Sequence, residues 1–266
     1  MEFPEHKNKY PFRLAAPSFI FPADYITNAR QLAPYLDEVE LLFFESDPAS
    51  LPTPFEIEQL RQLQEEQKID YNIHLPLDLD ICSLNQTDAG RAAAALVRVI
   101  DLVRPLTATT YTLHLPLKDP AGMEDSRLVR AWQDRALLGL DRVISRAAIP
   151  SRRISVETLN YPPEWLGPLV ERMDLSICLD LGHVILYGFD PGSVFFQFGS
   201  RITICHLHGV SKGKDHLALQ HLDAYYHQEL KTFLAGFTQT VSLEVFSARA
   251  LSESMQALAA LMQQDT

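Results

Sequence analysis

Histidines recur at the same point of three similar apolar segments. The segments are 71-YNIHLPLDLD-80, 111-YTLHLPLKDP-120 and 203-TICHLHG-209. Carboxylates lie in further β-rich segments of the chain, at Glu157, Asp180 and Glu244. Imidazole and carboxylate together are ligands for zinc, manganese or iron, whereas calcium and magnesium favour an all-oxygen set. The residue types therefore indicate a divalent-metal site.

Each of these residues also has an ordinary structural interpretation. A single histidine in an apolar strand is more often a hydrogen-bonded core residue than a ligand, and a lone glutamate in a strand is often ion-paired inside a barrel. The set as a whole differs, because burying four imidazoles and three carboxylates together without a cation costs much free energy. A divalent cation removes that cost, so the joint pattern favours the metal site.

Short β-rich segments alternate with helical patterns along the chain. The predicted strands are 12–20, 38–45, 69–76, 109–116, 153–160, 176–183, 202–209 and 240–247, and the clearest predicted helices are 54–68, 88–104, 125–148 and 249–264. Eight strand–helix units in 266 residues are typical of an α/β protein with a (β/α)8 TIM barrel. The alternative is an open doubly wound sheet, which favours a glycine-rich phosphate loop that is absent here. We expect one domain over residues 1–266.

The carboxyl ends of barrel strands converge on one mouth, and the candidate residues lie near those ends. Six consecutive predicted strands each carry an imidazole or a carboxylate there: His74, His114, Glu157, Asp180 with His183, His206 with His208, and Glu244. The segments 184–201 and 210–229 follow the sixth and seventh strands and look like irregular loops. Loops at this end of a barrel usually carry function.

Composition and charge restrict the class of protein. The chain is 47% hydrophobic and 21% charged, with a formal net charge of −11. This charge argues against a nucleic-acid partner. The spacing of Cys82, Cys178 and Cys205 fits neither a zinc ribbon nor a disulfide framework, and no segment resembles a signal peptide or a membrane span. We expect a cytoplasmic protein with reduced thiols, a small-molecule substrate and no membrane partner, and we leave its oligomeric state open.

The order Glu157, 180-DLGH-183, 206-HLHG-209 and Glu244 resembles the xylose isomerase-like TIM-barrel superfamily, which includes sugar epimerases and the endonuclease IV repair enzymes. The resemblance implies that Glu157, Asp180, His206 and Glu244 bind one metal ion, as in the epimerases. It also implies that His74, His114 and Glu157 bind a second ion, as in endonuclease IV. A third site would use His183 and an Asp-x-His loop, but here that loop reads 214-KDH-216, with Lys214 in the place of the aspartate.

The opening segment 11–46, together with YNIHLPLDL, resembles more closely the cobamide-remodelling phosphodiesterases of this superfamily. That resemblance implies hydrolysis of the nucleotide-loop phosphodiester of a cobamide, a vitamin B12-type corrinoid, to cobinamide phosphate and a lower-base riboside. The expected cofactors are two divalent ions, zinc or manganese with iron also compatible, bridged by Glu157. Two metals suit phosphodiester hydrolysis, whereas a divalent-metal sugar or sugar-phosphate epimerase, the alternative function, needs one.

The remaining residues receive roles by position. Glu157, His183, Lys214 and His216 are expected to act in catalysis, although the general acid is not assigned among them. His208, Glu45 and Tyr187 are candidates for binding substrate. Glu40 is expected to form an interior ion pair, and Cys178 and Cys205 are expected to be packing residues.

Overall fold

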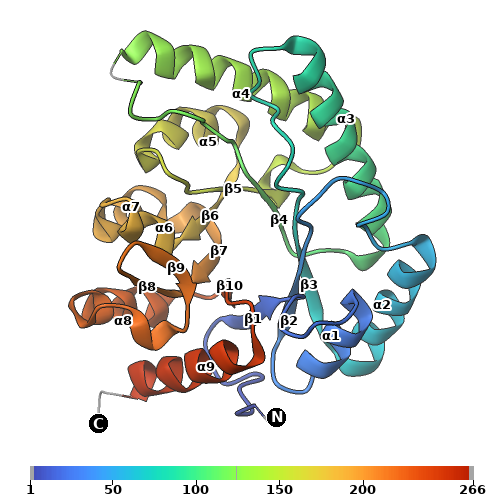
Figure 1. The fold of residues 1–266 in the computed structure, drawn as a ribbon, viewed down its shortest axis with the longest axis vertical. Coiled ribbons are helices and arrows are strands. Elements are labelled where there is room, and N and C mark those ends of the chain that lie inside the picture. The colour runs from blue at the N-terminus through green and yellow to red at the C-terminus, as the bar shows by residue number, and fades with distance from the viewer. Residues whose placement is uncertain (1–2, 124, 264–266) are drawn as a thin grey trace.

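The computed structural model describes residues 3–123 and 125–263 and shows a closed barrel of strands surrounded by helices (Figure 1). The barrel strands are β1 (Arg13–Pro17), β2 (Glu38–Leu42), β3 (Asp70–His74), β4 (Tyr111–Leu113), β5 (Ile154–Glu157), β6 (Ser176–Asp180), β7 (Ile202–Leu207) and β10 (Thr240–Leu243). They pair in parallel in the order β1-β10-β7-β6-β5-β4-β3-β2. The predicted eight-stranded TIM barrel is therefore confirmed.

Helices follow the strands and cover the outside of the barrel (Figure 1). They are α1 (Tyr25–Leu32), α2 (Pro54–Gln67), α3 (Gln86–Val103), α4 (Ser126–Ala147), α5 (Gly167–Met173), α6 (Leu181–Leu186), α7 (Pro191–Phe198), α8 (His227–Gly236) and α9 (Ala248–Gln263). Local sequence sets several of their starts. Thr53 and Glu56 form a reciprocal capping box at α2, and the Asp125 side chain caps α4. Across residues 3–123 and 125–263, no helix is long and apolar enough to span a bilayer.

The prediction of irregular loops after the sixth and seventh strands is wrong. Residues 184–201 contain the second half of α6 and all of α7, whose start is fixed by the Asp190 cap and by Pro191 in the first turn. Residues 209–217 form an antiparallel hairpin of β8 (Gly209–Ser211) and β9 (Lys214–Leu217). The turn of this hairpin uses Lys212 and Gly213, both with positive φ, so its signal lies in turn chemistry rather than in hydrophobic periodicity.

Side chains alternate along each strand between the helices and the barrel interior. The outward set is apolar and fully buried beneath the helices, as with Val39, Leu41, Ile177 and Leu179. Many of the complementary positions carry polar or charged side chains instead. The interior of this barrel therefore contains polar groups that need hydrogen-bond or ion-pair partners. Which partners they have differs between the two ends of the barrel.

Towards the amino-terminal end of the barrel, Glu38 has a full set of such partners. The buried Glu38 carboxylate accepts hydrogen bonds from Arg13 Nε at 2.8 Å, Asn72 Nδ2 at 2.7 Å and Thr240 Oγ1 at 2.9 Å, and a further one from Thr109. Burial raises the pKa of Glu38, and these donors oppose that rise. Glu38 is thus a structural carboxylate whose hydrogen bonds are all made. The carboxylates at the carboxyl end of the barrel can be compared with it.

Candidate metal centre

The predicted ligands meet at the carboxyl end of the barrel because each one stands at or just beyond the end of a strand. His74, Glu157 and Asp180 are the last residues of β3, β5 and β6, whereas His114 and Glu244 directly follow β4 and β10. His206 lies in β7 opposite Asp180 in the register. Apart from His114, whose side chain is 21% exposed, these side chains are almost completely buried.

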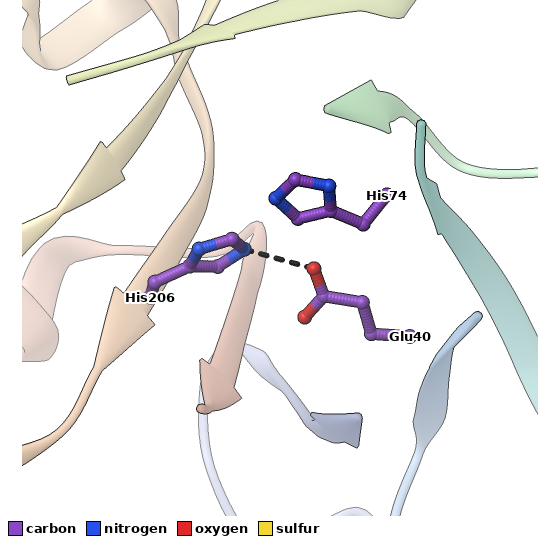
Figure 2. A group of neighbouring side chains, drawn as sticks. All are labelled: Glu40, His74 and His206. Atoms are coloured by element: carbon purple, nitrogen blue, oxygen red, sulfur yellow. Dashed lines mark ion pairs between the residues drawn. The ribbon is translucent and has the colours of Figure 1, made fainter. Parts of the chain in front are cut away.

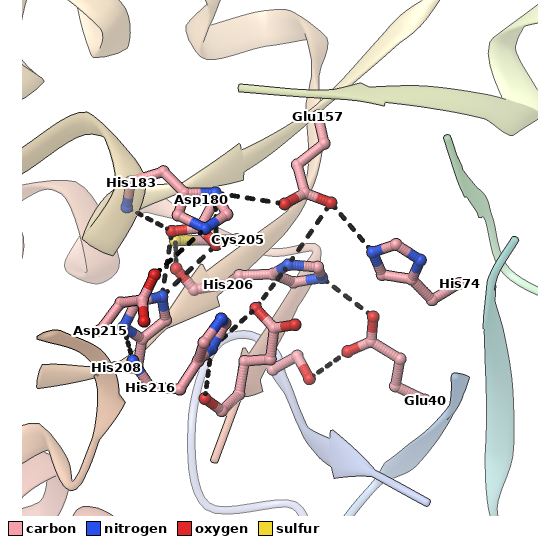
Figure 3. A network of polar contacts seen from close by, with 12 residues as sticks. Glu40, His74, Glu157, Asp180, His183, Cys205, His206, His208, Asp215 and His216 are labelled. Carbon is pink, nitrogen blue, oxygen red and sulfur yellow. Dashed lines mark hydrogen bonds and ion pairs between the residues drawn. The ribbon is translucent and has the colours of Figure 1, made fainter. Parts of the chain in front are cut away.

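Glu157 lies between two groups of imidazoles. Its Oε2 atom is 3.0 Å from His74 Nε2 and 2.9 Å from His114 Nε2. Its Oε1 atom is 3.4 Å from His183 Nδ1, and that nitrogen is 3.1 Å from Asp180 Oδ2. Figure 3 shows Glu157 between His74 on one side and His183 on the other. One carboxylate therefore faces donors on both sides, which is the position of a bridging ligand.

His206 is a further member of this cluster and uses its two ring nitrogens differently. Nδ1 is 3.1 Å from Glu244 Oε2 and 4.0 Å from Glu157 Oε2. Nε2 is 3.0 Å from Glu40 Oε1. Figure 2 marks this ion pair with a dashed line. Metal-bound histidines commonly present their second nitrogen to a carboxylate. The geometry thus fits Nδ1 as the ligating atom and Glu40 as its outer partner, which gives the expected interior ion pair of Glu40 a chemical role.

The hydrogen bonding of this cluster shows that its residues fit a cation. Both ring nitrogens of His206, Glu40 Oε1 and Glu244 Oε2 are buried without a hydrogen-bond partner, although they lie within ion-pair distance of one another. The contacts therefore lack hydrogen-bond alignment, in contrast to the saturated Glu38. Buried polar atoms without aligned partners are costly. A divalent ion between His206 Nδ1 and Glu244 Oε2 would satisfy these two atoms.

Charge in the cluster is balanced by protons on the imidazoles. Burial by itself would lower the pKa of His183, but the Asp180 and Glu157 carboxylates raise it to about 10. Burial would likewise raise the pKa of Glu157, yet His114, His183 and His74 hold it well below its ordinary value. Metal binding would displace such protons, because a ligating imidazole must be neutral.

A third group of candidate ligands includes Asp215 and His216 of β9 together with His183. His183, Asp215 and His216 bring ligand atoms within 4.8 Å of one another, with His183 Nε2 3.8 Å from Asp215 Oδ2. Lys214 is exposed on β9, so the carboxylate that approaches His183 belongs to its neighbour. His216 has a φ of 49°, a left-handed conformation that is strained for a side chain of this size. Sequence spacing alone points to Lys214 and misses Asp215.

His208 supports the site without belonging to the predicted ligands. Its Nδ1 atom accepts the His216 backbone N–H at 3.0 Å, which leaves the Nε2 proton to be donated to Asp180 Oδ1 at 3.1 Å. The ring is fully buried and lies against Gly182. The structure thus places His208 where it orients Asp180, and its predicted contact with substrate stays a prediction.

The other predicted site residues occupy different places. Tyr187 lies beside His183, with ring centroids 6.2 Å apart, and is 47% exposed. Glu45 is exposed beyond β2 and accepts a hydrogen bond from Ser50 Oγ at 3.2 Å, so it stabilises its own loop. All three cysteines are free and buried, and Cys178 Sγ lies with Glu157 and His206 in one potential ligand group. Its position two residues before Asp180 on the same strand face is the signal for this contact.

Comparison with known proteins agrees with this architecture. The family described as xylose isomerase-like TIM barrel matches residues 29–263. The chain belongs to this family. Its superfamily consists of enzymes that include epimerases and an endonuclease, and divalent metals are bound by its members. A metal centre built from histidine and carboxylate at the barrel mouth is consistent with that membership.

Solved structures resemble the chain over almost its whole length. A D-tagatose 3-epimerase-like protein superposes with a TM-score of 0.76 at 19% identity, covering 95% of this chain and 97% of the other. D-psicose 3-epimerase from Clostridium cellulolyticum gives 0.74 at 15% identity, covering 94% and 98%. Endonuclease IV from Thermus thermophilus gives 0.70 at 17% identity, covering 95% and 99%. At these identities the likeness shows the fold alone. Among curated proteins, none matches the chain in sequence.

Proposed function

We propose that this chain is a two-metal phosphodiesterase that cleaves the nucleotide-loop phosphodiester of a cobamide. The observation that carries the proposal is the placement of Glu157 between two sets of donors, with His74 and His114 on one side and His183 with Asp180 on the other. A single-metal enzyme leaves the His74–His114 pair without a purpose. Paired metals suit displacement at phosphorus, because both the attacking and the leaving oxygen need stabilisation.

The proposed roles follow from position in the cluster. His74, His114 and Glu157 would hold one ion, and Glu157, Asp180, His206 and Glu244 the other. When bound, the two ions lower the pKa of water and neutralise charge on the phosphate. Water oxygen then bonds to phosphorus while the bond to the riboside oxygen breaks, and that oxygen takes up a proton. His183 and His216 contact the cluster but belong to neither ligand set, so we assign proton transfer to them, and Lys214 would add positive charge at the rim.

The cobamide substrate is supported by the resemblance of residues 11–46 and the first HLPL segment to cobamide-remodelling phosphodiesterases. The net charge of −11 supports it as well, since a cobamide is an amide-rich and nearly neutral ligand, whereas DNA is a polyanion. The fold itself is shared with endonuclease IV. The prediction that nucleic acid is not a partner therefore depends on charge rather than on fold.

The test is incubation of the metal-loaded protein with an adenosylated cobamide, with and without a chelator, followed by chromatography and mass measurement. We expect cobinamide phosphate and the lower-base riboside only without the chelator. Absence of both products from a protein that retains two metals would discard the cobamide while leaving phosphodiester hydrolysis to be tested on other esters.

A divalent-metal sugar or sugar-phosphate epimerase is the second candidate. The observation in its favour is that His206 Nδ1 lies between Glu244 at 3.1 Å and Glu157 at 4.0 Å, which provides two carboxylates around one metal position. Two such carboxylates can remove and return a proton on opposite faces of a sugar carbon. This function requires one ion per chain and predicts that loss of His114 has no effect on metal content.

A further inference from the structure

We propose that Lys118 and the cavity beside His183 form an anion subsite that receives a phosphate group of the substrate. The proposal rests on the proposed function only for the identity of the ester that carries this phosphate. It adds a residue in the loop after β4 that was not among the site residues predicted from sequence, and it assigns to that residue a role in substrate specificity.

The cavity has a volume of about 220 Å³ and opens next to the metal cluster. Its polar lining comes from Lys118, Asn160, His183 and Tyr187, and the rest is apolar. His183 belongs both to this lining and to the cluster, where its Nδ1 atom lies 3.1 Å from Asp180 and 3.4 Å from Glu157. A ligand in the cavity is therefore one side chain away from the metal centre.

Three polar side chains around the cavity make no hydrogen bond or ion pair within the described part of the protein. Among the residues described by the structure, the side chains of Lys118, Asn160 and Tyr187 have no hydrogen-bond or ion-pair partner. An ammonium, an amide and a phenol thus surround one space with free donors. Phosphate offers several acceptor oxygens and negative charge, and it is the class of ligand that such a set recognises.

The repeated HLPL segments provide an internal comparison. Asp78 follows the first histidine by four residues, and Lys118 follows the second at the same spacing. Asp78 accepts a hydrogen bond from Ser46 Oγ at 2.9 Å and so joins its loop to the segment that follows β2. Within the described part of the chain, Lys118 has no such structural contact. The charge reversal between two otherwise similar loops therefore has no structural explanation, and a ligand supplies one.

The neighbouring acidic groups are compatible with this role. Asp119 is directed to its own turn, where its Oδ1 atom accepts the Gly122 backbone N–H at 3.1 Å. Glu157 and Asp180 would have their charge balanced by metal ions. Lys118 is the lysine in the lining of the cavity, in a protein whose net charge of −11 otherwise repels phosphate.

The experiment is calorimetric titration of inorganic phosphate into the full-length, metal-loaded protein. We expect Lys118→Met to raise the Kd for phosphate about tenfold, the loss typical of one charge-assisted hydrogen bond at an exposed site, and Lys118→Arg to recover most of the affinity. Lys212→Met removes the same charge from the exposed turn of the β8–β9 hairpin and is the matched control. It should leave the Kd unchanged.

Equal phosphate affinity in Lys118→Met and the unaltered protein would refute the subsite, as would an equal loss in Lys212→Met. A second variant, Asn160→Ala, should weaken phosphate binding by a smaller factor without removing charge. The outcomes separate this proposal from the proposed function. Cobamide cleavage with Lys118-independent phosphate binding overturns only the subsite, whereas Lys118-dependent phosphate binding without cobamide cleavage overturns only the substrate assignment.

Discussion

Replacement of Glu157 by glutamine is the change that should affect this site most. The substitution keeps the shape of the side chain and removes its charge. Glu157 is buried, and its two oxygens contact three imidazoles at 3.0, 2.9 and 3.4 Å, so both halves of the metal centre lose the same carboxylate. Loss of an outer partner of a metal ligand typically costs about 10–100-fold in affinity. Loss of a shared ligand should therefore weaken metal binding by about 100-fold or more.

The assay is metal content after dialysis against buffered zinc or manganese, together with hydrolysis of the proposed substrate. Glu38→Gln is the matched control, because Glu38 is equally buried in the barrel but makes its hydrogen bonds to Arg13, Asn72, Thr109 and Thr240. We expect Glu38→Gln to retain its metal. A Glu157→Gln protein with the metal content and affinity of the unaltered protein would refute the bridging role.

Three further predictions follow from the same geometry. His114→Ala should reduce the metal content from two ions to one while the thermal unfolding temperature of the metal-free protein changes little, whereas an unchanged content would support the single-metal epimerase. The raised pKa of His183, about 10 against an ordinary 6.5, stabilises the metal-free fold below pH 6.5, and this contribution should disappear as pH rises toward 10. Unfolding temperatures measured in chelator should decline between pH 6.5 and pH 10, and His183→Gln should flatten that decline. Metal affinity should instead rise with pH, because the metal competes with protons for the imidazoles. Gly182→Ala would place a Cβ against the His208 ring, displace Asp180 and reduce metal affinity about 10–100-fold. Gly90→Ala adds a Cβ that meets nothing within 4 Å outside the local helix backbone, so it should leave metal affinity unchanged. The opposite ranking of the two variants would show that His208 does not position Asp180.

The fold could be predicted from sequence because local patterns and global topology agree. Eight β-rich segments alternate with amphipathic helices, and the carboxyl ends of parallel strands necessarily meet at one mouth. That rule alone brings together His74, Glu157 and Asp180, which lie far apart along the chain. The sequence does not predict the helices after β6 because α6 and α7, with six and eight residues, are too short for a periodic pattern to be distinct.

The details of the site depend on side-chain direction, which strand positions only partly determine. Glu40 could be placed inside the barrel, but its approach to His206 Nε2 needed the register between the strands. Asp215 reaches His183 because the β8–β9 hairpin turns back over the mouth, and no periodicity indicates that hairpin. Among the described residues the Lys118 ammonium has no partner, and this depends on the contacts of its loop, which the sequence does not determine.

The count of tightly bound divalent ions per chain tests the central claim most directly. Elemental analysis of the purified protein, after equilibration with zinc or manganese and removal of excess metal, should give two ions or more per chain. One ion per chain, unchanged by His74→Ala and His114→Ala, would contradict the two-metal centre and with it the phosphodiesterase.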